Sequence, residues 1–356
     1  MDPARQQLTI QEGVPLAPLT TFRVGGPARY FAHVTSEAEM LEGLEWAQSA
    51  GVPAVALGGG SNLLVPDEGF PGLVIALALR GVARREDEVQ VAAGENWDEL
   101  VSFTVGQDLA GMECLAGIPG SVGATPVQNV GAYGQEVAET IRSVRAYDRQ
   151  SHCFVELTAA ECRFRYRGSL FNADEPGRFL VTQVTFVLRP GVRAELRYAD
   201  LRNFFAGYVG DPSLPEVAEA VRSIRRSKGM VLMPGDADTQ SAGSYFKNAI
   251  VPTEELNDIA ELSGYKPAEI PRYPAQPGWF KLPAAWLVEQ AGFSRGFQLG
   301  RAGLSTRHTL ALTNRGGATC ADILSLEDHI RTGVLEKFGV LLEREPILLQ
   351  PDAAMI

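Results

Sequence analysis

A run of three glycines followed by two polar residues is the first segment of this chain with an evident chemical use. The loop consists of Gly58, Gly59, Gly60, Ser61 and Asn62. Glycine lacks a Cβ atom, so the N–H groups of such a loop can approach a ligand closely, and pyrophosphate oxygens suit them as acceptors. A tight turn between two strands would use the same glycines. Taken alone, this segment is better explained as a turn between two strands than as a binding loop.

A second glycine-rich segment favours a binding site. Residues 116–136 read AGIPGSVGATPVQNVGAYGQE and carry polar side chains at Ser121, Thr125, Gln128 and Asn129 among five glycines. The segment is too apolar for a solvated linker, and a loop of this length inside a compact domain is usually functional. Its backbone and side-chain donors and acceptors can line a flat heterocycle.

The charge of the chain excludes some partners and permits others. The formal net charge of -11 gives no basic surface of the kind that attracts nucleic acid or an anionic membrane, so neither is expected as a partner. A local basic cluster can still receive an anionic small molecule, because short-range fields depend on the nearest charges. Such a cluster consists of Arg222, Arg225, Arg226 and Lys228.

The cysteines and histidines do not indicate a metal site, and we expect none. The thiols form no CxxC pair, which is typical of a reducing compartment, and the imidazoles lack spacing such as HExxH. The start of the chain has no basic region before an apolar run, and no segment offers about twenty uninterrupted apolar residues. We therefore expect a cytoplasmic protein. The residues concerned are Cys114, Cys153, Cys162, Cys320, His33, His152, His308 and His329.

The elements that must position the two loops indicate an α+β fold. The sequence predicts a helix over residues 36–51, with Ser36 and Glu39 forming a capping box. A short strand over residues 52–57 then leads into the first glycine loop. A dinucleotide-binding βαβ unit requires a helix directly after such glycines, but prolines and glycines interrupt residues 66–72. The Rossmann interpretation therefore fails.

Further strands and helices follow in mixed order, with strands the more frequent. Strands are predicted at residues 73–79, 88–93, 143–147 and 179–188. Helices are predicted at residues 96–106, 216–226, 252–263, 283–291 and 319–338. The 356 residues exceed the usual size of a single core, so we expect two or three domains, with a boundary near the end of the helix at 216–226.

Five motifs occur along the chain in a defined order. They are GGGSNLL, GIPGSVGATPVQNVGAYG, CRFRYRGSLF, AGSYFKN and the C-terminal LEREPI. Together they resemble the family of UDP-N-acetylenolpyruvoylglucosamine reductases, and the resemblance covers nearly the whole chain. It implies an FAD-binding fold of the vanillyl-alcohol oxidase and p-cresol methylhydroxylase type, followed by a smaller α/β substrate domain.

The resemblance also implies a division of the chain. Residues 1–226 would form the FAD-binding region, made of two subdomains that split near residue 72. Residues 227–339 would form the substrate-binding domain. Residues 340–356 would return to the active site and the FAD-binding region.

The catalytic residues implied by the resemblance are Arg167, Ser244 and Glu345. The guanidinium of Arg167 would bind the substrate carboxylate, and Ser244 would donate a proton. The motif LEREPI departs from the more usual proline between its two acids, so Glu343 also fits the position. The register of the preceding residues favours Glu345.

The remaining residues would bind FAD without a covalent bond, or bind the substrate. The FAD residues would be Gly58, Gly59, Gly60, Ser61, Asn62, Gly117, Ile118, Pro119, Gly120, Ser121, Gly123, Gln128 and Asn129. The substrate residues would be Tyr166, Tyr198, Arg225, Lys228 and Asn248.

The implied activity is the NADPH-dependent reduction of a UDP-linked enolpyruvyl amino sugar through FAD, in bacterial cell-wall synthesis. Two alternatives remain open at this point. An alcohol or hydroxy acid oxidase would use the same FAD fold, but AGSYFKN and Lys228 favour the sugar nucleotide. A nucleotide-sugar sensor would bind without turnover, and it would not need a proton donor such as Ser244.

Overall fold

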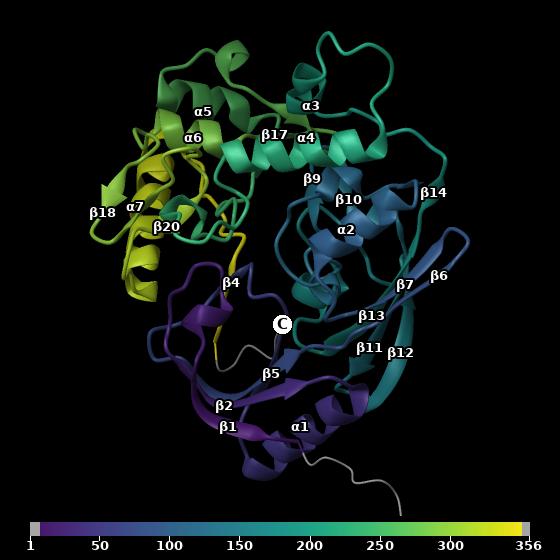
Figure 1. Cartoon of the computed structure of the whole chain (residues 1–356). Coiled ribbons are helices and arrows are strands. Elements are labelled where there is room, and N and C mark those ends of the chain that lie inside the picture. The colour runs from purple at the N-terminus through teal and green to yellow at the C-terminus, as the bar shows by residue number, and fades with distance from the viewer. Residues whose placement is uncertain (1–7, 351–356) are drawn as a thin grey trace, which may run out of the picture.

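The computed structural model describes residues 8–350, and its N-terminal part is a sheet covered by one helix (Figure 1). The strand order is β1-β2-β5-β3, and β5 is parallel to both of its neighbours. Helix α1 (Glu37–Ala50) buries Met40 and Ala47 against this sheet. The strands are β1 (Ile10–Pro15), β2 (Pro27–Val34), β3 (Ala54–Leu57) and β5 (Phe70–Leu77).

The second part is an antiparallel sheet with the order β12-β11-β13-β7-β6. Helices α2 (Trp97–Gly106) and α4 (Leu214–Ser227) pack on each other, and both contribute buried residues to the hydrophobic cluster of this sheet. The strands are β6 (Val82–Arg85), β7 (Glu88–Ala92), β11 (Ile141–Asp148), β12 (Cys153–Thr158) and β13 (Phe179–Val187).

The third part combines two small antiparallel sheets with three helices, which Figure 1 shows in green and yellow at the upper left. Its hydrophobic cluster also takes in Phe22, Val24 and Leu64 from the N-terminal part, so the first and third parts share one core. The strands are β15 (Ala249–Pro252), β16 (Tyr273–Pro274), β17 (Trp279–Leu282), β18 (Gln298–Leu299), β19 (Ala302–Leu304) and β20 (Leu312–Asn314). The helices are α5 (Glu255–Ser263), α6 (Ala284–Gln290) and α7 (Cys320–Phe338).

The last described residues return to the first glycine loop. Strand β21 (Ile347–Leu348) pairs in parallel with β4 (Leu63–Leu64), which directly follows the loop. This pairing brings Glu345 next to residues 58–62. The other short elements are β8 (Leu109–Ala110), β9 (Gly131–Ala132), β10 (Gln135–Glu136), β14 (Arg189–Pro190) and α3 (Ala199–Phe204).

The α+β prediction is confirmed, and helix α1 shows how local signals define an element. The Ser36 hydroxyl accepts a hydrogen bond from the Glu39 N–H at 3.1 Å, and Gly51 ends the helix in the left-handed conformation. The Glu39 carboxylate, however, accepts from the N–H of Thr35 at 2.6 Å, one residue before the predicted partner. The capping-box prediction is therefore correct for its serine half.

Two predicted boundaries are wrong. A split near residue 72 falls inside β5, whose hydrogen bonds to both neighbours form the centre of the first sheet. The helix predicted from residue 252 begins at Glu255, because Ala249–Pro252 pairs with β17 as a strand. In both places pairing with a distant strand overrides the local pattern.

No helix within residues 8–350 is long and apolar enough to cross a membrane.

Candidate active site

A cavity of about 460 Å³ lies where the glycine loops, the second sheet and the third part of the chain meet. Its volume is within the range of small-molecule and cofactor sites. The wall includes every residue of the first glycine loop, residues 118–121 of the second, and Thr239 with residues 241–244. Segments distant in sequence therefore build one site.

The two glycine loops touch each other through their backbones. A Cβ atom added to Gly59 would lie 2.5 Å from the Cα of Gly120, and one on Gly58 would lie 2.6 Å from the Ser121 hydroxyl. Gly60 has a φ of 60°, and a Cβ there would lie 2.0 Å from the carbonyl oxygen of Leu19. These glycines are thus required by close packing as well as by backbone conformation.

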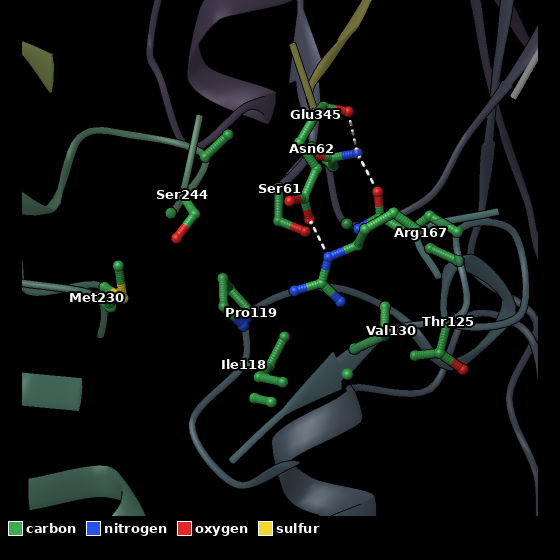
Figure 2. A pocket seen from close by; sticks show the side chains of 18 of the residues that line it. Ser61, Asn62, Ile118, Pro119, Thr125, Val130, Arg167, Met230, Ser244 and Glu345 are labelled. Atoms are coloured by element: carbon green, nitrogen blue, oxygen red, sulfur yellow. Dashed lines mark hydrogen bonds and ion pairs between the residues drawn. The ribbon is translucent and has the colours of Figure 1, made fainter. Parts of the chain in front are cut away.

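The first loop presents unpaired N–H groups at the cavity. Within residues 8–350, the N–H groups of Gly59, Gly60 and Ser61 have no hydrogen-bond partner. Gly60 is buried, and buried backbone donors are nearly always paired, so this row of N–H groups fits an anionic ligand with several oxygens. The side chain of Asn62 is fixed by donating to Gln128 at 2.5 Å and to the Glu345 carbonyl at 3.3 Å (Figure 2).

Two residues predicted to contact FAD do not line the cavity. The Asn129 side chain is buried and donates to the Glu136 carboxylate at 2.7 Å. Gly117 donates its N–H to the Asp98 carboxylate at 2.6 Å, and its carbonyl accepts from Arg225. Both residues hold the second loop in shape and take no part in the wall.

Arg167 and Glu345 form a buried ion pair at the edge of the cavity. The Arg167 Nε lies 3.0 Å from the Glu345 Oε1, and the side chains are 19% and 12% exposed. The backbone of Arg167 has a φ of 53°, a left-handed conformation that is uncommon for a residue with a side chain. Figure 2 shows the other guanidinium nitrogens directed away from Glu345, where they are available to a ligand.

Burial shapes the electrostatics of this pair. It raises the pKa of the Glu345 carboxyl, and the neighbouring Arg167 charge offsets part of that effect. Burial opposes the charged form of Arg167, but Glu345 and Tyr166 hold the pKa of the guanidinium above its usual range. The site therefore combines a charged arginine with a carboxyl that binds its proton more tightly than usual.

The geometry separates the two candidate acids of LEREPI. The Glu343 side chain is 74% exposed and lies 3.4 Å from the Lys247 ammonium, outside the cavity. Glu345 lies in the wall.

Ser244 reaches the cavity from a different side than the ion pair, as Figure 2 shows. It is half-buried, and its hydroxyl has no hydrogen-bond partner within the described chain. Nearby, the backbone N–H of Asn248 donates to the Tyr166 hydroxyl at 3.3 Å, and the side-chain Oδ1 of Asn248 accepts from the Ala284 N–H at 2.9 Å. The Lys281 ammonium lies 4.5 Å from the centre of the Tyr166 ring.

The predicted basic residues differ in what their charges contact. Arg225 lines the cavity, but its guanidinium donates to the carbonyls of Gly117 and Met230, and it therefore ties α4 to the second loop. Lys228 also lines the cavity, and its ammonium lies 2.5 Å from the Asp200 carboxylate. Among the aromatic residues, Tyr198 is 46% exposed at the rim and packs edge-on against Tyr133.

Sequence reasoning missed His308 and several apolar wall residues. His308 accepts a hydrogen bond on Nδ1 from the Leu310 N–H at 3.0 Å. Burial, together with the charges of Lys228 and Arg295, lowers its pKa to about 4, so the imidazole is neutral. No ligand spacing in the sequence distinguishes it from the other histidines. Other missed wall residues include Tyr133, Met230, Leu232 and Tyr273.

No group of histidine, cysteine and acidic side chains suited to a metal ion occurs in the part of the chain that the structure describes.

Comparisons with known proteins show relatives along almost the whole chain. The family model described as the C-terminal domain of UDP-N-acetylenolpyruvoylglucosamine reductase matches residues 235–349, and an FAD binding domain model matches residues 28–154. The UDP-N-acetylenolpyruvoylglucosamine reductase of Streptomyces coelicolor is 47% identical, with 97% of this chain and 92% of that protein covered. The enzyme of the same name from Saccharopolyspora erythraea is 48% identical, with 95% of each chain covered.

A solved structure is also similar over almost the entire fold. The crystal structure of the reductase from Thermus caldophilus has a TM-score of 0.66 and 25% sequence identity. The match covers 96% of this chain and 100% of the other.

Proposed function

This chain belongs to the UDP-N-acetylenolpyruvoylglucosamine reductase family, and we propose that the cavity between its glycine loops and Ser244 is the active site. The protein is an FAD-containing oxidoreductase. It uses NADPH to reduce UDP-N-acetylglucosamine enolpyruvate to UDP-N-acetylmuramate in peptidoglycan precursor synthesis. The observation that supports the site assignment most strongly is the buried Arg167–Glu345 pair in a cavity that also contains Ser244.

The residues present fit FAD. The unpaired N–H groups of the first loop suit the pyrophosphate, and the apolar wall formed by Ile118 and Pro119 with residues 179 and 181 of the second sheet suits an aromatic ring system. When bound, FAD supplies hydride transfer between NADPH and the enolpyruvyl carbon. The loop residues bind and orient the cofactor and keep water from the reacting atoms.

The chain's own polar groups act on the substrate. The free nitrogens of Arg167 are placed to bind the enolpyruvyl carboxylate, where negative charge develops as the double bond is reduced. Glu345 holds the guanidinium in place and keeps its charge. Ser244 donates the proton to the carbon next to the carboxylate, which completes the reduction.

We also propose a division of the chain and a location. The hydrophobic cluster of the second sheet consists of residues before 226 alone, which supports an FAD-binding region up to residue 226, a substrate-binding domain over residues 227–339 and a returning segment from 340. The cluster of the substrate-binding domain also takes in Phe22, Val24 and Leu64, so the two regions are packed together. Four free thiols support the reducing cytoplasm as the location.

A spectroscopic experiment tests the function. The purified protein is reduced with NADPH in the absence of oxygen and then mixed with either the enolpyruvyl sugar nucleotide or oxygen. Fast return of the yellow flavin band with the sugar nucleotide is expected. Fast return with oxygen alone would instead support the oxidase, and a protein that NADPH does not bleach would support the sensor.

FAD is expected to leave the protein completely on acid precipitation. None of the four cysteines lines the cavity, and the single lining histidine, His308, has its Nδ1 occupied by the Leu310 N–H. The measurement is the flavin absorbance of the supernatant and of the washed pellet. Colour that stays in the pellet would show a covalent bond.

Lys228→Ala and Tyr198→Phe are expected to weaken binding of the sugar nucleotide more than they change the flavin spectrum. Lys228 would neutralise a substrate phosphate and Tyr198 would donate its hydroxyl, and a lost charge-assisted hydrogen bond costs about 1.5–3 kcal/mol. The Michaelis constant for the sugar nucleotide should therefore rise about tenfold or more.

Arg226→Ala is the matched control for Lys228→Ala. Arg226 belongs to the same basic cluster, but its side chain pairs with Glu219 and does not line the cavity. An unchanged Michaelis constant in both Lys228→Ala and Tyr198→Phe, or an equal rise in Arg226→Ala, would show that the substrate assignment is wrong.

A further inference from the structure

Glu327 is a buried acidic residue that lies outside the cavity and takes no part in the chemistry described above. It is in the middle of α7, and its side chain is 6% exposed. Its Oε2 accepts hydrogen bonds from the Tyr245 hydroxyl at 2.6 Å and from the Arg344 Nη1 at 3.0 Å. One carboxylate oxygen therefore joins two segments that are far apart in the sequence.

Both donors are direct neighbours of proposed catalytic residues. Tyr245 follows Ser244, and Arg344 precedes Glu345. The two segments also pair through their backbones, since the Glu345 N–H donates to the Tyr245 carbonyl at 2.8 Å. Glu327 thus contacts one residue of each segment at the point where the Ser244 segment pairs with the Glu345 segment.

The chemistry of this contact requires all three side chains. A buried carboxylate is costly unless hydrogen bonds and an opposite charge compensate it. Tyr245 is fully buried, and burial together with the Glu327 charge raises the pKa of its hydroxyl, so it remains a donor. Arg344 supplies the opposite charge, and the Arg331 Nη1 lies 3.6 Å from the other carboxylate oxygen.

A buried carboxylate oxygen that accepts hydrogen bonds from two side chains favours one relative arrangement of the segments that it joins. An apolar residue at position 327 would fill the same space in the core without fixing their register.

We propose that Glu327 is a positioning residue for substrate reduction. Through Tyr245 and Arg344 it sets where the Ser244 hydroxyl lies relative to the Glu345 carboxyl. The proposal rests on the proposed function, because it assigns Glu327 an effect on the step in which Ser244 donates its proton. A small displacement of a reacting group can cost up to about a hundredfold in rate.

Tyr245→Phe is the primary test, because it removes only the hydroxyl and keeps the packed ring. The reduction of bound FAD by NADPH and the dissociation constant of the sugar nucleotide should stay at their parental values. The single-turnover rate of substrate reduction should fall about tenfold to a hundredfold. Stopped-flow absorbance gives both rates, and titration of the flavin spectrum gives the dissociation constant.

Tyr265→Phe is the matched control. Its hydroxyl donates to Gln290 at 2.5 Å next to the same hydrophobic cluster, away from the cavity. It should leave both half-reactions unchanged while lowering the unfolding temperature to a similar extent. The proposal is overturned if Tyr245→Phe slows neither half-reaction, if it slows both equally, or if the control matches it.

Arg344→Met tests the same carboxylate from its partly exposed side and decides the matter if Tyr245→Phe does not fold with FAD. The same selective loss of substrate reduction is expected, and an unchanged or unselective effect would refute the proposal. Failure of the proposed function gives a different result, because Ser244→Ala would then leave substrate reduction at the parental rate.

Discussion

Replacing Ser244 by alanine is expected to leave the reduction of bound FAD by NADPH near the parental rate and to slow substrate reduction about 10²–10⁴-fold. The first half-reaction needs no proton from this hydroxyl. The second requires a proton on the carbon next to the carboxylate, and a methyl group cannot provide it. Binding should change little, because one hydroxyl contributes modestly to the affinity for so large a ligand.

The measurement is a pair of anaerobic stopped-flow experiments on Ser244→Ala. Protein that has been reduced beforehand is mixed with the sugar nucleotide, and the return of the flavin band is followed. Ser263→Ala is the control, since its hydroxyl bonds only the carbonyls of Ile259 and Ala260 within α5. Return at the parental rate would exclude Ser244 as the proton donor. Equal slowing of both half-reactions would indicate a damaged flavin site.

Arg167→Met is expected to lower the rate of substrate reduction about 10²–10³-fold and to weaken substrate binding as well. The guanidinium is placed to bind the carboxylate both before and during the reaction, so its loss affects both quantities. The change also leaves the Glu345 carboxyl buried without its partner. Because Arg167 opposes the rise that burial causes, the pKa of Glu345 should increase further in this variant.

Arg167→Lys should give a smaller loss, since it keeps the charge but not the planar pair of donors. Arg165→Met is the matched control, because Arg165 belongs to the same segment but pairs with Asp174 outside the cavity. The assignment of Arg167 fails if Arg167→Met changes only the rate with an unaltered Michaelis constant, or if Arg165→Met has the same effect.

Local sequence signals predicted the elements better than the site. Helix α1 begins after Ser36 and ends before Gly51, as these two residues indicate. Helix α7 begins after Thr319, whose hydroxyl accepts from the Asp322 N–H. Such caps involve residues only a few positions apart, so a sequence contains all the information that they need. The start of α5 and the continuity of β5 depend on distant strands, and both were placed wrongly.

The site shows the same limit at the level of single residues. The side-chain amide of Asn129 could in principle contact a cofactor, but in the structure it donates to the Glu136 carboxylate inside the loop. Alternation along a strand could not separate Glu343 from Glu345, because the difference arises from pairing with residues 245–247. His308 lies in the cavity wall beside residues that are distant in the sequence, so the residues next to it in the chain give no sign of its position.

The contact between the two glycine loops limits how their sequences can be recombined. Gly59 packs against the backbone of Gly120, and Gly58 packs against Ser121, so neither loop has room for an added side chain at these contacts. A chimaera can combine residues 58–62 of one relative with residues 117–123 of another. Such a protein tolerates a side chain in place of one of these glycines only if the backbone of the other loop moves away. The two segments must therefore be exchanged together, although strands β4 to β8 and helix α2 separate them in the chain.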